Sequence, residues 1–113
     1  ATLTCTTGPE PTHETLPLAA LFVFIGQQPR TEWLPDEIIR DDGGFISTGP
    51  GAAGDAARPA GWALDRDPYL LESSVPGVFA AGDVRARSVK RIASAVGEGS
   101  MAIQFVHQYR ATL

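Results

Sequence analysis

A glycine and an aspartate at the end of a short apolar run are the residues of this sequence best placed to do chemistry. The run Val75–Ala81 opens at a Pro-Gly turn and shrinks to alanines before Gly82 and Asp83, which is typical of a buried strand. Gly82 lets another surface approach the backbone closely. Asp83 places a carboxylate at the carboxyl end of the strand, where open α/β sheets bind ligands. The pattern predicts a ligand-binding edge.

A basic segment and a helix follow this pair directly. Four of the nine basic residues lie within Arg85–Arg91. The helix expected from about Val89 to Tyr109 has unpaired N–H groups in its first turn, and these favour an anion. A solvated basic loop is the alternative interpretation of these charges, but an anionic cofactor accounts better for Lys90 and Arg91 beside the Gly-Asp pair. We therefore predict the edge of a nucleotide-cofactor site.

These residues also resemble a known family. Pro76–Asp83, Lys90–Ala93 and Gly97–Gly99 look like the second FAD-binding motif of low-molecular-weight bacterial thioredoxin reductases. Phe22–Thr31 resembles the strand of that family that leads into a Gly-x-x-Pro turn. The resemblance covers most of residues 16–110 and fits the C-terminal third of such an enzyme. It implies an α/β fold: a partial FAD/NAD(P)-binding Rossmann-like domain with short strands and one long C-terminal helix.

The resemblance assigns roles to the matched residues. Asp83 would accept a hydrogen bond from a ribityl hydroxyl of FAD, and the backbone N–H groups at the start of the helix would meet the N1–C2=O edge of the flavin. The predicted cofactor-binding residues are Gly82, Asp83, Lys90, Arg91, Ile92 and Ala93. Arg91 stands where glutamine is common and Ile92 where alanine is common, so their side-chain roles stay open. We predict no catalytic residue and no metal ligand in this chain.

By the same resemblance, the whole protein would be an NADPH-dependent flavoprotein oxidoreductase of thioredoxin-reductase type, passing electrons from NADPH through FAD to a disulfide or another acceptor. The NADPH site, the loop for the ADP half of FAD and any dithiol would precede residue 1, so this fragment alone should bind FAD poorly and be inactive. We expect thioredoxin or another redox acceptor as partner, and a homodimer. The presence of a Cys-x-x-Cys dithiol stays open. The alternative is a non-catalytic interaction or regulatory module that keeps the fold without flavin.

The resemblance also divides the chain. Residues 1–25 would be the end of an NADPH-domain-like meander and its last strand, Leu16–Ile25, whose continuous apolar character predicts cover on both faces. Residues 26–113 would be the C-terminal segment of the FAD-binding domain. Within it, the Gly/Ala/Pro-rich stretch 49–61 has no hydrophobic period and predicts a flexible loop. No apolar strand leads directly into that stretch, so its Gly-x-Gly-x-x-Gly spacing is not interpreted as a phosphate loop.

Shorter elements are predicted from local patterns. Strands are expected at Ala1–Thr7 and Tyr69–Glu72, and a helical turn is expected at Thr31–Leu34. Asp41–Gly44 has the composition of a hairpin turn between two short strands. Gly8–Pro11 should break the first strand, with His13 in the turn that follows.

Composition excludes several classes of function. With 113 residues and a net charge of −4, the surface as a whole does not favour nucleic acid or anionic membranes. No apolar run approaches the roughly 20 residues of a membrane-spanning helix. Cys5 is the only cysteine, so no disulfide forms within the chain, which favours a reducing cytoplasm. The sequence starts at Ala1 without a methionine, and we expect it to be part of a longer protein.

Overall fold

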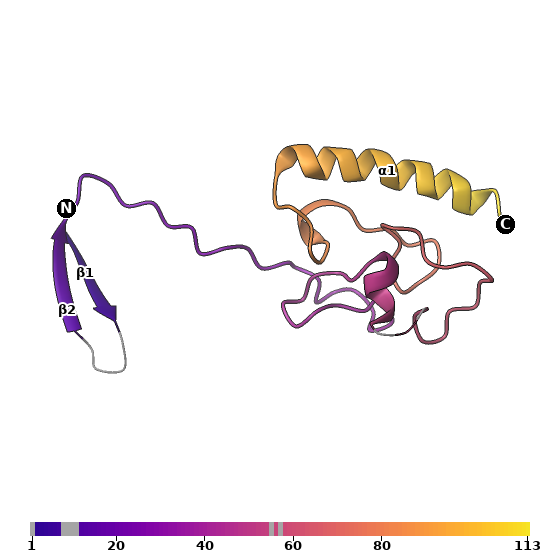
Figure 1. The fold of residues 1–113 in the computed structure, drawn as a ribbon, viewed down its shortest axis with the longest axis horizontal. Helices are drawn as coiled ribbons and strands as arrows, with labels where there is room; N and C mark the ends of the chain where they lie inside the picture. The colour runs from indigo at the N-terminus through magenta and orange to yellow at the C-terminus, as the bar shows by residue number, and fades with distance from the viewer. Residues whose placement is uncertain (1, 8–11, 55, 57) are drawn as a thin grey trace.

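The computed structural model of the protein describes residues 2–7, 12–54, 56 and 58–113. A small hairpin at the N-terminus is joined by an extended segment to a compact C-terminal part, along one side of which a long helix lies (Figure 1). The molecule measures 63 × 30 × 23 Å. The extended segment accounts for this elongated shape. Residues that position a functional site are therefore to be sought in the compact C-terminal part.

The hairpin consists of β1 (Thr2–Thr7) and β2 (Thr12–Pro17), which pair antiparallel with Thr2 opposite Pro17. The strand expected in the first seven residues is confirmed. The turn expected around His13 is wrong, because residue 13 pairs with Thr6 within β2. The β-branched threonines of this region favour pairing over a turn. The chain break expected at Gly8–Pro11 lies outside the described residues, as do the side chains of Cys5 and His13.

The apolar segment Leu21–Ile25 is extended but unpaired. Of the strand predicted over Leu16–Ile25, only its first two residues belong to β2, and Phe24 and Ile25 are 92% and 91% exposed. The prediction of a covered strand is therefore wrong in this structure. A strand needs a neighbour for its backbone and layers for its faces, and among the described residues nothing supplies either. The division of the chain at residue 25 stays a prediction.

A small core organises the C-terminal part. Its buried members are Ile38, Ile46 and Ala80. The turn predicted at Thr31–Leu34 is confirmed by a 3.1 Å hydrogen bond from the N–H of Leu34 to the carbonyl of Thr31. The turn predicted at Asp41–Gly44 is also confirmed, but the strands around it amount to one bridge between Arg40 and Ile46.

The apolar run Val75–Ala81 pairs with the residues before it. Phe79 forms an isolated antiparallel bridge with Glu72, supported by hydrogen bonds from Ser73 N–H to Val78 O and from Ala80 N–H to Leu71 O. The predicted strands Tyr69–Glu72 and Val75–Ala81 are thus reduced to this short ladder. It has a partner on one side only, and isolated strand pairs of this kind are marginal. Few strands and one long helix, α1 (Ile92–Arg110), make up the fold.

The stretch 49–61 is better packed at its start than predicted. Gly49–Ala53 forms a 3₁₀ helix, η1, in which Ala52 is only 1% exposed. The Gly49 N–H donates to the carbonyl of Glu72 at 2.8 Å, and a Cβ at Gly49 would lie 2.8 Å from the Leu70 carbonyl oxygen. The small side chains of these residues permit this close packing, and the flexibility expected for the stretch 49–61 stays a prediction.

A fully buried carboxylate ties this region together. Glu72 accepts two hydrogen bonds from Arg66, at 2.6 and 2.9 Å, and one each from the N–H groups of Tyr69 and Gly77. The Arg66 guanidinium also lies 4.0 Å from the centroid of the Tyr69 ring. That ring stacks on Phe105 of α1. The Glu72–Arg66 ion pair and the ring of Tyr69 therefore link the ladder to Phe105 of the long helix.

We expect Glu72→Gln to lower the free energy of unfolding by about 3 kcal/mol, because it leaves the partly buried Arg66 without a counter-charge. Urea unfolding followed by circular dichroism measures this. Asp65→Asn is the matched control. Asp65 is exposed, and its ion pair with Arg58 is long, at 3.8 Å, so this substitution should leave the urea midpoint unchanged. Equal effects of the two substitutions would contradict the assignment.

The same contacts predict an acid sensitivity. Burial raises the pKa of the Glu72 carboxyl, but the hydrogen bonds from Arg66, Gly77 and Tyr69 outweigh burial and leave this pKa below its ordinary value of 4.5. A lowered pKa in the folded state gives stability that is present above the unfolded pKa and lost as the pH falls through the folded pKa. Urea midpoints should therefore drop below about pH 4.5 in the wild type and less steeply in Glu72→Gln.

Candidate cofactor site

Gly82 begins the short 3₁₀ helix η2 (Gly82–Val84) and has a backbone φ of +79°. A Cβ at this position would lie 3.1 Å from the Cβ of Ala95. Side chains rarely adopt such a φ, so glycine is required here both by conformation and by the close approach of α1. The surface that approaches Gly82 in this structure is therefore the long helix itself.

Glu98, on α1, holds η2 in place. Its carboxylate accepts a 2.7 Å hydrogen bond from the Gly82 N–H, a 3.1 Å bond from Arg85 Nε and a further bond from Arg85 Nη2. The hydrogen bond from Arg85 lowers the pKa of Glu98, the Gly82 N–H lowers it further, and together they outweigh the opposing effect of burial. Glu98 is thus a buried, charged acceptor that fixes the residues on both sides of Asp83.

The Asp83 side chain is exposed and lines a small pocket of about 140 Å³. The segment 27–30 and Phe45 form most of the rest of that pocket. This segment includes most of the Gly-x-x-Pro turn noted in the sequence, and we call residues Gly26–Thr31 the crossing segment. The structure therefore brings Asp83 and the crossing segment together.

A second pocket, of about 550 Å³, adjoins the first. It is lined by residues 23–27, Phe45, Lys90 and Arg91, and it shares Gln27 and Phe45 with the pocket of Asp83. We call the two together the crossing groove. Three of the predicted cofactor-binding residues, Asp83, Lys90 and Arg91, line it.

The remaining predicted residues lie beside the groove rather than in its lining. Gly82 is buried under α1, while Ile92 and Ala93 form the exposed first turn of that helix, Ile92 with 87% of its surface accessible. Arg91 is the N-terminal capping residue of α1 and makes no side-chain capping hydrogen bond. The first-turn N–H groups thus remain available to a ligand at the end of the groove next to Arg91.

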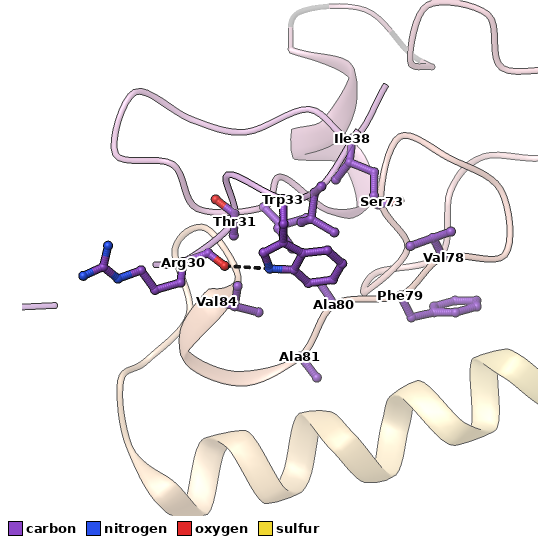
Figure 2. Close-up of a pocket in the computed structure, with 12 residues that line it drawn as sticks. Arg30, Thr31, Trp33, Ile38, Ser73, Val78, Phe79, Ala80, Ala81 and Val84 are labelled. Atoms are coloured by element: carbon purple, nitrogen blue, oxygen red, sulfur yellow. Dashed lines mark hydrogen bonds between the residues drawn. The ribbon is translucent and has the colours of Figure 1, made fainter. Parts of the chain in front are cut away.

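A third pocket, lined mostly by apolar residues, has a different character. It holds about 390 Å³ and is lined by Trp33, core residues and the run Val78–Ala81. Figure 2 shows Trp33 over Ala80 and Val84, with its indole N–H donating to the Arg30 carbonyl at 2.9 Å. None of the predicted cofactor-binding residues lines it. Arg30 is its single charged lining residue, so the pocket offers packing surface and little chemistry.

Two kinds of feature are missing from the described part of the chain. Its acidic, histidine and cysteine side chains form no group of three that could hold a metal ion. The helices among those residues include none with the length and apolar character needed to cross a membrane.

Sequence reasoning missed Glu98 and Arg85 as a pair. Glu98 entered only as the middle residue of a Gly-Glu-Gly sequence, and Arg85 only as one charge of a basic loop. The signal that could have found them was a lone acidic residue on a helix whose neighbours are small or apolar, since such a residue, if buried, needs a cationic partner. Nothing local to Glu98 identifies a partner that lies 13 positions earlier.

The sequence is similar to known proteins over most of its length. No family model matches the sequence. The thioredoxin reductase of Listeria monocytogenes is 32% identical over 94 residues, which are 83% of this chain and 24% of that protein. The thioredoxin reductase of Bacillus subtilis is 33% identical over 89 residues, 79% of this chain and 22% of that protein. The chain is thioredoxin reductase-like.

The solved structures agree with this assignment. The crystal structure of thioredoxin reductase from Streptococcus pyogenes covers 99% of this chain with a TM-score of 0.63 at 26% identity, and the match takes in 30% of that structure. The resemblance to thioredoxin reductases is thereby confirmed, and the one long helix and few strands are consistent with part of an FAD/NAD(P) Rossmann-like domain. This thioredoxin reductase-like chain spans about a quarter of the length of the curated relatives that it matches.

We expect Gly82→Ala to lower the free energy of unfolding by about 1–2 kcal/mol for the left-handed backbone alone, and further because Ala95 must move. Gly97→Ala is the control, because a Cβ there meets nothing within 4 Å in the described structure and alanine favours the helix by about 0.5–1 kcal/mol. Thermal unfolding should therefore shift in opposite directions. A shift of the same sign for both would contradict the role given to Gly82.

Proposed function

We propose that this chain is the C-terminal FAD-binding segment of an NADPH-dependent flavoprotein oxidoreductase. The observation that supports this proposal most is the juxtaposition in one groove of Asp83 with Lys90 and Arg91, the two residues that lead into α1. A carboxylate and an uncapped helix N-terminus suit the two chemically different parts of a flavin, its hydroxyl-rich chain and its electron-poor ring edge. The relatives named thioredoxin reductase support the same assignment.

The groove has dimensions and groups that fit such a ligand. Its larger pocket, at about 550 Å³, falls within the roughly 300–1,000 Å³ of small-molecule sites. Apolar side chains from residues 23–25 and the ring of Phe45 line the larger pocket, which suits a flat aromatic ring. The exposed Asp83 carboxylate can accept hydrogen bonds without first giving up a partner that the described residues supply.

Each predicted residue takes a role in this proposal. Asp83 accepts a hydrogen bond from the ribityl chain and so holds the flavin in register. Gly82 gives η2 the backbone turn that presents Asp83. The backbone N–H groups of Ile92 and Ala93 face the ring edge and stabilise negative charge there, with Lys90 and Arg91 beside them. The flavin, when bound, supplies the redox chemistry by accepting hydride from NADPH and passing electrons on.

The rest of the activity belongs to residues outside this chain. We propose that NADPH binds there and that the electron acceptor is thioredoxin, another disulfide or another redox partner. The whole protein is proposed to be a cytoplasmic homodimer. The single cysteine, Cys5, provides no dithiol within this chain, so in this proposal residues outside the chain determine the acceptor.

The decisive experiment is a visible absorbance spectrum of the full-length protein before and after anaerobic addition of NADPH. We expect a flavin spectrum that bleaches. A full-length protein that is colourless and takes up no FAD would contradict the proposal and would favour the alternative, an interaction or regulatory module with the same fold.

In the full-length protein, Asp83→Ala should weaken FAD binding by about 10–100-fold, the effect of losing a hydrogen bond to a charged acceptor. FAD titration of the apoprotein, followed by quenching of flavin fluorescence, measures this. Asp65→Ala removes an exposed carboxylate outside the groove and serves as the control. Unchanged affinity in Asp83→Ala would remove Asp83 from the site.

The 113-residue chain alone is expected to bind no stoichiometric flavin, because in this proposal the loop for the ADP half of FAD lies outside the chain and the crossing groove would hold only the other part. Purification in the presence of excess FAD, followed by gel filtration and absorbance, tests this. A flavin-to-protein ratio near one would show that the segment is a complete flavin site.

A further inference from the structure

The ammonium group of Lys90 is fully engaged by the protein itself. Its Nζ donates to the carbonyl oxygen of Asp83 at 2.7 Å, to that of Arg85 at 3.0 Å and to the Ser88 hydroxyl at 2.8 Å. It also lies 4.2 Å from the centroid of the Phe45 ring. A lysine has three N–H donors, so these contacts use every donor that Lys90 possesses.

These acceptors all belong to one loop. Asp83 lies within η2, Arg85 and Ser88 lie on the segment that leaves it, and Lys90 stands just before Arg91, the residue that caps α1. The ammonium therefore closes the loop on itself and draws the backbone of Asp83 toward the start of the helix. Its cationic charge is balanced by carbonyl dipoles and an aromatic face rather than by an exposed anion site.

Asp83 is consequently held from two sides. The contacts of Glu98 with Gly82 and Arg85 tie η2 to the second turn of α1. Lys90 ties the carbonyl of Asp83 itself to the residue next to the helix N-terminus. Of these anchors, Lys90 is the one that acts directly on Asp83 and within the crossing groove.

We propose that Lys90 is a positioning residue, which sets the place of the Asp83 carboxylate relative to the first turn of α1, and that its side chain does not bind the flavin. This inference rests on the proposed FAD site. Lys90 then supports the cofactor site without contacting the cofactor. A direct contact with a flavin would require its ammonium group to give up one of its present acceptors. The neighbouring Arg91, whose side chain donates to the Lys90 carbonyl, is better placed to meet an anion.

A double-mutant cycle on the full-length flavoprotein separates positioning from contact, because only residues that act through one another show coupled effects. FAD affinity is measured by fluorescence titration for the wild type, Lys90→Met, Asp83→Ala and the double variant. We expect Lys90→Met to weaken binding about tenfold when Asp83 is present, a typical effect of a lost charge-assisted hydrogen bond. In the Asp83→Ala background, the same change should cost less than about twofold.

Two further variants serve as controls for charge and for folding. Arg87→Met deletes a neighbouring exposed charge that makes no hydrogen bond or ion pair within the described residues, and should leave FAD affinity unchanged. Lys90→Gln, which keeps an amide donor, should fall between wild type and Lys90→Met, and it serves as the test if Lys90→Met does not fold. Thermal unfolding of each apoprotein confirms that affinities are compared between folded proteins.

The outcomes are distinct. An equal loss of affinity in both backgrounds would show that Lys90 touches the flavin, and no loss in either would show that it has no role; both overturn the proposal. A wild-type protein that binds no FAD would instead defeat the proposed function on which this inference rests. A loss of FAD affinity on Lys90→Met that occurs only when Asp83 is present supports positioning by Lys90.

Discussion

The candidate site depends on one buried acceptor, the carboxylate of Glu98. Gly82 is the first residue of η2, so its N–H has no partner within that helix, and an unsatisfied N–H at a buried position is costly. Glu98 satisfies it at 2.7 Å and at the same time binds Arg85. Both ends of η2 are therefore fixed to the same residue of α1. The exposed Asp83 stands between them, so the contacts of Glu98 fix the backbone on both sides of it.

Glu72 has a comparable part in the ladder, where it replaces sheet contacts that the strand pair lacks. A short strand pair with a neighbour on one side has few backbone hydrogen bonds to hold it. The Glu72 carboxylate accepts from the N–H groups of Tyr69 and Gly77 on either side of the turn and from the side chain of Arg66. Buried ion pairs of this kind contribute geometry more reliably than net stability. In this chain, two of them place the run Val75–Ala81 and the residues that follow it.

Sequence patterns predicted the elements whose causes are local. The helix was expected from about Val89 to Tyr109 and spans Ile92–Arg110, because its helical spacing of apolar residues is a property of the segment itself. The turn at Asp41–Gly44 is equally local, since Asp41 Oδ1 accepts from N–H groups two and four residues ahead. The position of Asp83 beside the helix start was predicted from the order of apolar run, glycine, carboxylate and helix, and the family motif pointed to the same residues.

The features that were missed depend on distant partners. A strand over Leu21–Ile25 requires neighbours that the described chain does not provide, so its apolar pattern alone could not make it a strand. The packing of η1 depends on Leu70 and Glu72. These residues lie on the order of 20 positions later, so the contact closes a long loop at a cost in entropy. Such a contact is hard to predict from the sequence. The bond from Gly82 to Glu98 spans 16 positions and leaves no local mark in the sequence.

The ion pair that holds η2 also settles an electrostatic conflict. Glu98 lies in the second turn of α1, close to a helix N-terminus that would have to face negative charge at a flavin edge. An unpaired carboxylate there would oppose that charge through a medium of low dielectric constant. Arg85 neutralises it at hydrogen-bonding distance, and the same guanidinium holds η2. The positive end of the α1 dipole is thereby left to the groove, so the contact that positions Asp83 also keeps the helix N-terminus suited to an anion.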